Sequence, residues 1–89
     1  MEQGLQDDVV ARGGDLLAGY ALSERRVVKC FEGQMLHSTK DGMVCRYAAR
    51  YMQHESYGDL YGRCTIEARF STHEGQPRLE EVLKVECAL

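Results

Sequence analysis

The sequence predicts an α+β domain in which one N-terminal helix packs on a four-stranded antiparallel β-meander. Three observations predict this fold class. Apolar residues recur at helical spacing near the N-terminus, apolar and polar residues alternate with period two in later segments, and short turn signals separate those segments. A chain of 89 residues is one domain with a single small core, so we expect residues 1–89 to fold as one unit.

Residues 4–22 are expected to form the helix. Two adjacent glycines, Gly13 and Gly14, lie inside it, and each interior glycine weakens a helix by about 1 kcal/mol relative to alanine. We expect this pair to let the helix lie close against the sheet. The apolar stripe of the helix is expected to consist of Leu5, Val9, Leu16 and Tyr20, with Val10 and Leu17 beside it.

Four strands are expected to follow, over residues 26–36, 43–53, 61–71 and 79–89. The Asp41-Gly42 dipeptide is typical of a hairpin turn, and turn residues around Gly58 and Gly75 separate the later strands. Because every connection is short, strands that are neighbours in sequence are expected to pair.

In the last hairpin, both faces of the sheet favour one register. This register places Ile66 opposite Leu83 in the core and brings opposite charges together on the other face. Its further predicted pairs are Phe70–Leu79, Arg63–Glu86 and Arg69–Glu80. For the preceding pair of strands, the alternation places Arg46 opposite Glu67.

The four cysteines are all expected on the inner face, which the helix covers. They have no metal-ligand spacing, and no apolar leader follows Met1. We therefore expect buried free thiols in a cytoplasmic protein, without a metal or a cofactor. The alternative is a periplasmic protein in which Met1 replaces a removed signal peptide and disulfides form. The cysteines are Cys30, Cys45, Cys64 and Cys87, of which Cys64 and Cys87 are predicted diagonal neighbours.

Charge and motifs argue against several classes of function. A net charge of −3 lacks the basic footprint of a non-specific nucleic-acid binder, so direct nucleic-acid binding is not expected. No apolar run is long enough to cross a membrane. The sequence has no phosphate loop, nucleophile elbow or zinc-binding helix motif, and we expect a protein that is not an enzyme.

The outer face of strands 26–36 and 43–53 is the expected partner-binding surface. It combines apolar side chains with lysine and arginine, and exposed apolar patches mark interfaces. The first strand is also a free edge, which favours strand addition by a partner. The alternative is a flipped or bulged first strand, with Phe31 and Met35 in the core. The expected partner-binding residues are Val27, Lys29, Phe31, Met35, Val44, Arg46, Ala48, Arg50 and Met52.

We therefore expect a small, non-enzymatic protein-binding module, whose partner is another protein or a second copy of the chain. In size and weak acidity the chain resembles small inhibitors that phages and mobile elements encode against host protein complexes, such as anti-CRISPR proteins. One alternative is a periplasmic or secreted, disulfide-stabilised binding domain of cystatin-like shape. Another is a small-ligand carrier or enzyme with a cavity between helix and sheet, lined by Tyr20, Tyr47 and Tyr51.

Overall fold

A computed structural model describes the backbone of residues 2–88 and the side chains of residues 7–88, so the predicted inward positions of Leu5 and Leu89 lie outside the described side chains. One helix and an antiparallel sheet make an α+β fold, and within these residues the sheet has five strands in the order β1-β2-β3-β4-β5. The elements are α1 (Glu2–Leu17), β1 (Ala21–Leu22), β2 (Arg25–Thr39), β3 (Gly42–Glu55), β4 (Gly58–His73) and β5 (Gln76–Ala88).

The helix ends at Leu17 rather than at residue 22, and this accounts for the additional strand. Gly19 has a φ of 89°, a left-handed conformation that glycine adopts without a steric penalty and that commonly terminates helices. The chain then forms β1, which pairs with the start of β2 by placing Ala21 opposite Arg26. The predicted number of strands was therefore too small by one short strand.

Gly13 and Gly14 bring α1 close to the sheet, as the sequence predicts. The helix runs through both glycines, and a Cβ atom at Gly13 would lie 2.9 Å from Cζ of Phe70 and still nearer the Tyr47 hydroxyl. Of the apolar side chains predicted to face the sheet from α1, Val9 and Leu17 are buried. The predicted inward positions of Leu16 and Tyr20 are wrong, since these side chains are 45% and 37% exposed.

Gly13→Ala is expected to destabilise the fold by about 1–2 kcal/mol. The added methyl group overpacks the core by more than the helix gains from alanine. Gly14→Ala is the matched control, because its Cβ would lie 3.3 Å from the Tyr47 ring, which needs a much smaller shift, and we expect it to be less destabilising than Gly13→Ala. Urea unfolding followed by circular dichroism measures both. Equal stabilities would contradict the close approach at Gly13.

The core lies between α1 and the inner face of the sheet. The predicted alternation is confirmed on β3 and β4, where inward side chains are buried and their neighbours are more exposed. Tyr47 donates a hydrogen bond of 2.5 Å to the Val10 carbonyl and packs edge-on against Phe70, with ring centroids 6.2 Å apart. The inward side chains of these two strands are Cys45, Tyr47, Ala49, Tyr51, Cys64, Ile66, Ala68 and Phe70.

The β3–β4 register is the predicted one, and the β4–β5 register agrees with the prediction only near the turn. Arg46 lies opposite Glu67, with a nitrogen–oxygen distance of 3.8 Å. Phe70 lies opposite Leu79 as predicted. Two single-residue bulges in β5, at Glu80 and Leu83, then shift the pairing by two positions. The predicted pairs Ile66–Leu83, Arg63–Glu86 and Arg69–Glu80 are therefore wrong.

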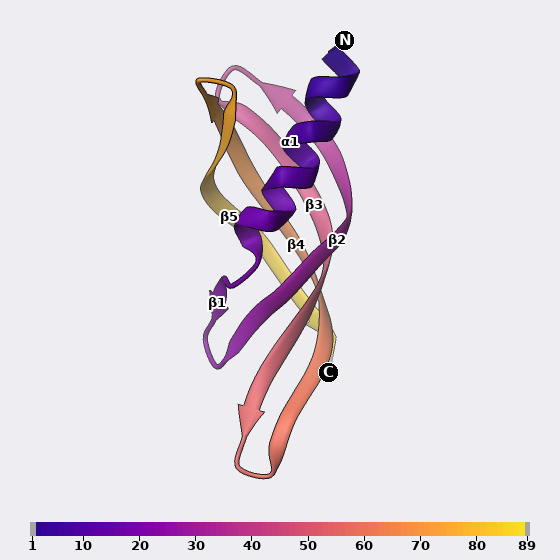
Figure 1. Cartoon of the computed structure of the whole chain (residues 1–89), viewed down its shortest axis with the longest axis vertical. Coiled ribbons are helices and arrows are strands. Elements are labelled where there is room, and N and C mark those ends of the chain that lie inside the picture. The colour runs from indigo at the N-terminus through magenta and orange to yellow at the C-terminus, as the bar shows by residue number, and fades with distance from the viewer. Residues whose placement is uncertain (1, 89) are drawn as a thin grey trace.

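The molecule is elongated, with principal extents of 49 × 19 × 17 Å. Figure 1 shows α1 lying along one face of the twisted sheet, while the hairpin between β3 and β4 projects beyond the end of the helix. Within the described residues, no helix is long and apolar enough to cross a membrane.

Candidate functional site

The structure divides the predicted partner-binding residues between the two faces of the sheet. Val27 and Met35 lie on the inner face, where Val27 is only 1% exposed and Met35 packs against the core. Val44 belongs to the outer face by its pairing, but it is buried. The predicted outward positions of Val27 and Met35 are wrong, whereas Val44 is on the predicted face but is not accessible. The predicted residues that do lie on the outer face with exposed or half-buried side chains are Lys29, Phe31, Arg46, Ala48, Arg50 and Met52.

Bulges in β2 cause this division. The β2–β3 pairing shifts three times, between Val27 and Lys29, between Phe31 and Gln34, and between Met35 and His37. Each shift changes which residues face inward, so a strict alternation cannot be read along β2. Phe31 remains on the outer face, opposite Ala48, and is not the core residue that the bulged alternative placed inside.

A row of three positive charges crosses the outer face. Lys29 pairs with Arg50, and Arg50 pairs with Arg63, so three neighbouring strands carry a cation at the same level. We call these three residues the cationic rung. All three are exposed. Like charges directly opposite each other destabilise a sheet, so this arrangement has a cost for folding.

Elsewhere on the outer face, several cations lie close to a carboxylate, although Arg26, opposite Met52, is in none of the ion pairs found among residues 7–88. Besides Arg46 with Glu67, Arg69 lies 3.4 Å from Glu81, and Lys84 lies close to Glu86. None of the ion pairs found among residues 7–88 includes a member of the cationic rung. The rung therefore differs in sign pattern from the sheet around it.

A groove of about 480 Å³ surrounds the cationic rung. Two aromatic side chains flank it, one on each side of the rung along the strand direction: Phe31 is half-buried, and Tyr61 is 55% exposed. The Arg50 guanidinium lies over the Tyr61 ring, 4.9 Å from its centroid, which holds the charge in place. The groove is lined by Lys29, Phe31, Arg50, Tyr61, Gly62 and Arg63.

Sequence analysis identified half of this groove. Lys29, Phe31 and Arg50 were predicted partner-binding residues, while Tyr61 and Arg63 were not. The alternation of β4 does indicate that Tyr61 and Arg63 lie on the outer face. Cys64 and Ile66 point inward, so the odd-numbered residues of this strand must point outward. The predicted Arg63–Glu86 pair placed Arg63 in an ion pair, and that pair does not form.

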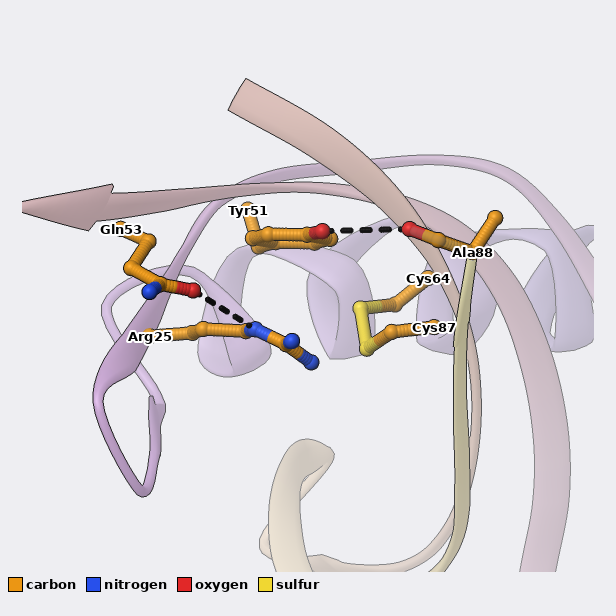
Figure 2. Close-up of a disulfide and its surroundings, with 6 residues drawn as sticks. All are labelled: Arg25, Tyr51, Gln53, Cys64, Cys87 and Ala88. Carbon is orange, nitrogen blue, oxygen red and sulfur yellow. Dashed lines mark hydrogen bonds between the residues drawn. A yellow bond between two sulfur atoms is a disulfide. The ribbon is translucent and has the colours of Figure 1, made fainter. Parts of the chain in front are cut away.

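A disulfide lies on the inner face of the same sheet region. The two bulges in β5 place Cys64 directly opposite Cys87, and these residues are bonded, so the expectation of four free thiols is wrong. Figure 2 shows the disulfide beside Tyr51, whose hydroxyl donates to the Ala88 carbonyl at 3.1 Å. The Arg25 guanidinium packs on the Tyr51 ring, 4.8 Å from its centroid.

The two remaining cysteines are poor nucleophiles at neutral pH. Burial, together with the negative charge of Asp15, raises the pKa of the Cys30 thiol from 9.0 to about 11. Burial also raises the pKa of the Cys45 thiol, although a hydrogen bond with Tyr47 opposes this. Because the thiolate is the reactive form, neither residue is placed for nucleophilic chemistry. Within the described residues, no group of three His, Cys, Asp or Glu side chains is arranged to hold a metal ion.

A second groove, of about 580 Å³, lies between α1 and the bulged part of β2. It corresponds to the cavity expected for a ligand carrier, but only Tyr47 of the three predicted tyrosines lines it. Tyr51 packs against the Arg25 guanidinium, and Tyr20 lies beyond the end of α1. The predicted tyrosine-lined cavity therefore does not form as a unit.

No family model, curated protein or solved structure matches this chain.

Proposed function

We propose that this chain is a small protein-binding module whose interface is the outer face of β2, β3 and β4 around the cationic rung. The observation that carries the proposal is the groove in which Phe31 and Tyr61 flank the rung. Aromatic and arginine side chains are the residues most enriched at interface hot spots. Half-exposed aromatics beside a groove supply apolar area that a partner can bury.

A different protein is favoured over a second copy as the partner. A two-fold symmetric contact through this face would bring two cationic rungs towards each other, and like charges facing each other across an interface cost several kcal/mol. That the module is not an enzyme stays a prediction. Inhibition of the partner, which the resemblance in size and charge implies, stays a prediction of the same kind.

The cellular compartment also stays a prediction. The expected compartment is the cytoplasm, and the alternative is the periplasm or the exterior. Disulfides persist mainly in oxidising compartments, so the bond between Cys64 and Cys87 is the feature that supports the alternative. Counting the free thiols of protein purified from its native host, under denaturing conditions that block exchange, distinguishes the two.

Phe31→Asp is expected to abolish association with the partner while the chain stays folded. The side chain is half-buried on the outer face, so a new carboxylate there remains hydrated in the free protein but is desolvated in the complex. Affinity capture from the native host, with mass spectrometry, identifies the partner. Size-exclusion chromatography and far-UV circular dichroism then compare binding and folding of the purified variants.

Leu83→Asp is the matched control, because Leu83 is an exposed apolar residue, 48% accessible, on the opposite edge strand. We expect it to bind normally. If Phe31→Asp unfolds the chain, Tyr61→Asp replaces it, since the Tyr61 side chain is more exposed. A folded variant at either position that still binds the partner normally would rule out the outer face.

A further inference from the structure

We propose that the cationic rung recognises an acidic segment of the partner, a short run of Asp or Glu side chains next to an apolar residue. This inference rests on the proposed function and adds the chemistry of the partner to it. Arginine binds carboxylates through two parallel hydrogen bonds, and Arg50 and Arg63 lie opposite each other on neighbouring strands, with Lys29 opposite Arg50 on the other side.

The first argument is the placement of charge within this chain. The sequence contains 14 acidic residues and only 11 lysines and arginines, so carboxylates are in surplus. Along the outer face, positions near Arg46 and Arg69 receive such a carboxylate. Among the side chains of residues 7–88, none that lines the groove around the cationic rung is acidic. The positive charges of the rung are therefore not neutralised by residues lining the groove, and the groove is complementary to a negatively charged partner.

The second argument is the neighbourhood of the rung. At the next level of the sheet lie Phe31, Ala48 and Thr65, followed by Glu86 on β5. At the level before it lie Met52 and Tyr61, preceded by Arg26 on β2. On β2 and β3 at the later level, and on β3 and β4 at the earlier level, the side chains beside the rung are therefore apolar or aromatic. A segment that combines carboxylates with an apolar side chain can satisfy both features of the groove, which a simple inorganic anion cannot.

A protein segment fits this surface better than a nucleic acid does. The face of Tyr61 over which Arg50 lies is already covered, so a base cannot stack there. A phosphate backbone also needs an extended basic track. Beyond the rung, the outer face carries Glu86 opposite Thr65, and then Glu67. These carboxylates would repel a continuing chain of phosphates, whereas a short acidic segment can end at the rung.

The binding experiment uses the full chain and two labelled probes, a polyglutamate peptide with one central phenylalanine and an oligothymidylate of equal charge. Fluorescence anisotropy at moderate ionic strength gives the two dissociation constants. Arg50→Glu is expected to weaken peptide binding at least about tenfold, because it places a like charge against the probe. Arg78→Glu, at an exposed position of β5, changes the net charge equally and is expected to weaken binding less than about twofold.

Equal losses for Arg50→Glu and Arg78→Glu would overturn the inference, because binding would then follow net charge alone. Tighter binding of the oligothymidylate than of the peptide would also overturn it in favour of nucleic acid. These outcomes are separate from the proposed function. If Phe31→Asp abolishes capture of the partner but Arg50→Glu does not, the interface stands and only its acidic recognition fails.

A second measurement needs no ligand. If the three cations of the rung repel one another, Lys29→Gln should raise the midpoint of thermal unfolding at low salt by about 1–5 °C. Because salt screens the repulsion, this increase should be smaller at high salt. A variant no more stable than wild type at low salt would show that the three charges do not repel, and would overturn the argument from charge placement.

Discussion

Ile66→Ala is expected to lower the free energy of unfolding by about 2–5 kcal/mol, the largest effect of any single substitution considered for this protein. Ile66 is fully buried in the middle of β4, between Tyr47 on β3 and Val85 on β5. Removing its three outer carbons leaves a cavity in a sheet that α1 covers on one side. The surrounding strands cannot collapse into it without disturbing both pairings.

Such a loss is a large share of the stability of a small domain, which is commonly about 5–15 kcal/mol. Urea unfolding of the variant measures it directly. Leu60→Ala is the matched control on the same strand, because Leu60 is 44% exposed, and its effect is expected to stay within about 0.5 kcal/mol. Similar losses for both variants would contradict the placement of the core around Ile66.

Replacing both Cys64 and Cys87 by alanine is expected to cost about 3 kcal/mol. The disulfide joins residues separated by 23 positions, and a closed loop of this length restricts the unfolded chain. It also ties the last residues of β5, an edge strand, to β4. Reductant should therefore lower the unfolding midpoint of the wild type towards that of the double variant.

Two measurements check the disulfide separately from its effect on stability. Alkylation in denaturant without reductant should modify two cysteines, Cys30 and Cys45. The Cys30→Ala variant should keep the full sensitivity to reductant, because its thiol takes no part in the bond. Four alkylated cysteines, or a midpoint that reductant leaves unchanged, would show that the bond does not form in solution.

Two of the three residues of the cationic rung, Lys29 and Arg50, could be predicted from the sequence as part of the candidate site. Alternation along β3 identified Arg50 as an outward residue, and the uninterrupted β3–β4 register followed from Arg46 and Glu67. The same alternation in β4 places Tyr61 and Arg63 outward, but the predicted Arg63–Glu86 pair concealed the excess of positive charge. Two bulges in β5 shift the register, so that Ala88 rather than Glu86 lies opposite Arg63. No local sequence pattern marks the positions of those bulges.

By itself the sequence determined the α+β class, the order of the long strands, and the buried faces of β3 and β4. These depend on local periodicity and on turn residues such as Gly42, which act over a few positions. Tertiary structure alone decided the end of α1, the face of each β2 residue, the Cys64–Cys87 bond, and the groove around the cationic rung. The end of α1 depends on the left-handed backbone of Gly19, and the other three depend on bulges in the strands. Such features are set by the packing of the whole sheet, because one inserted residue reverses every side chain beyond it.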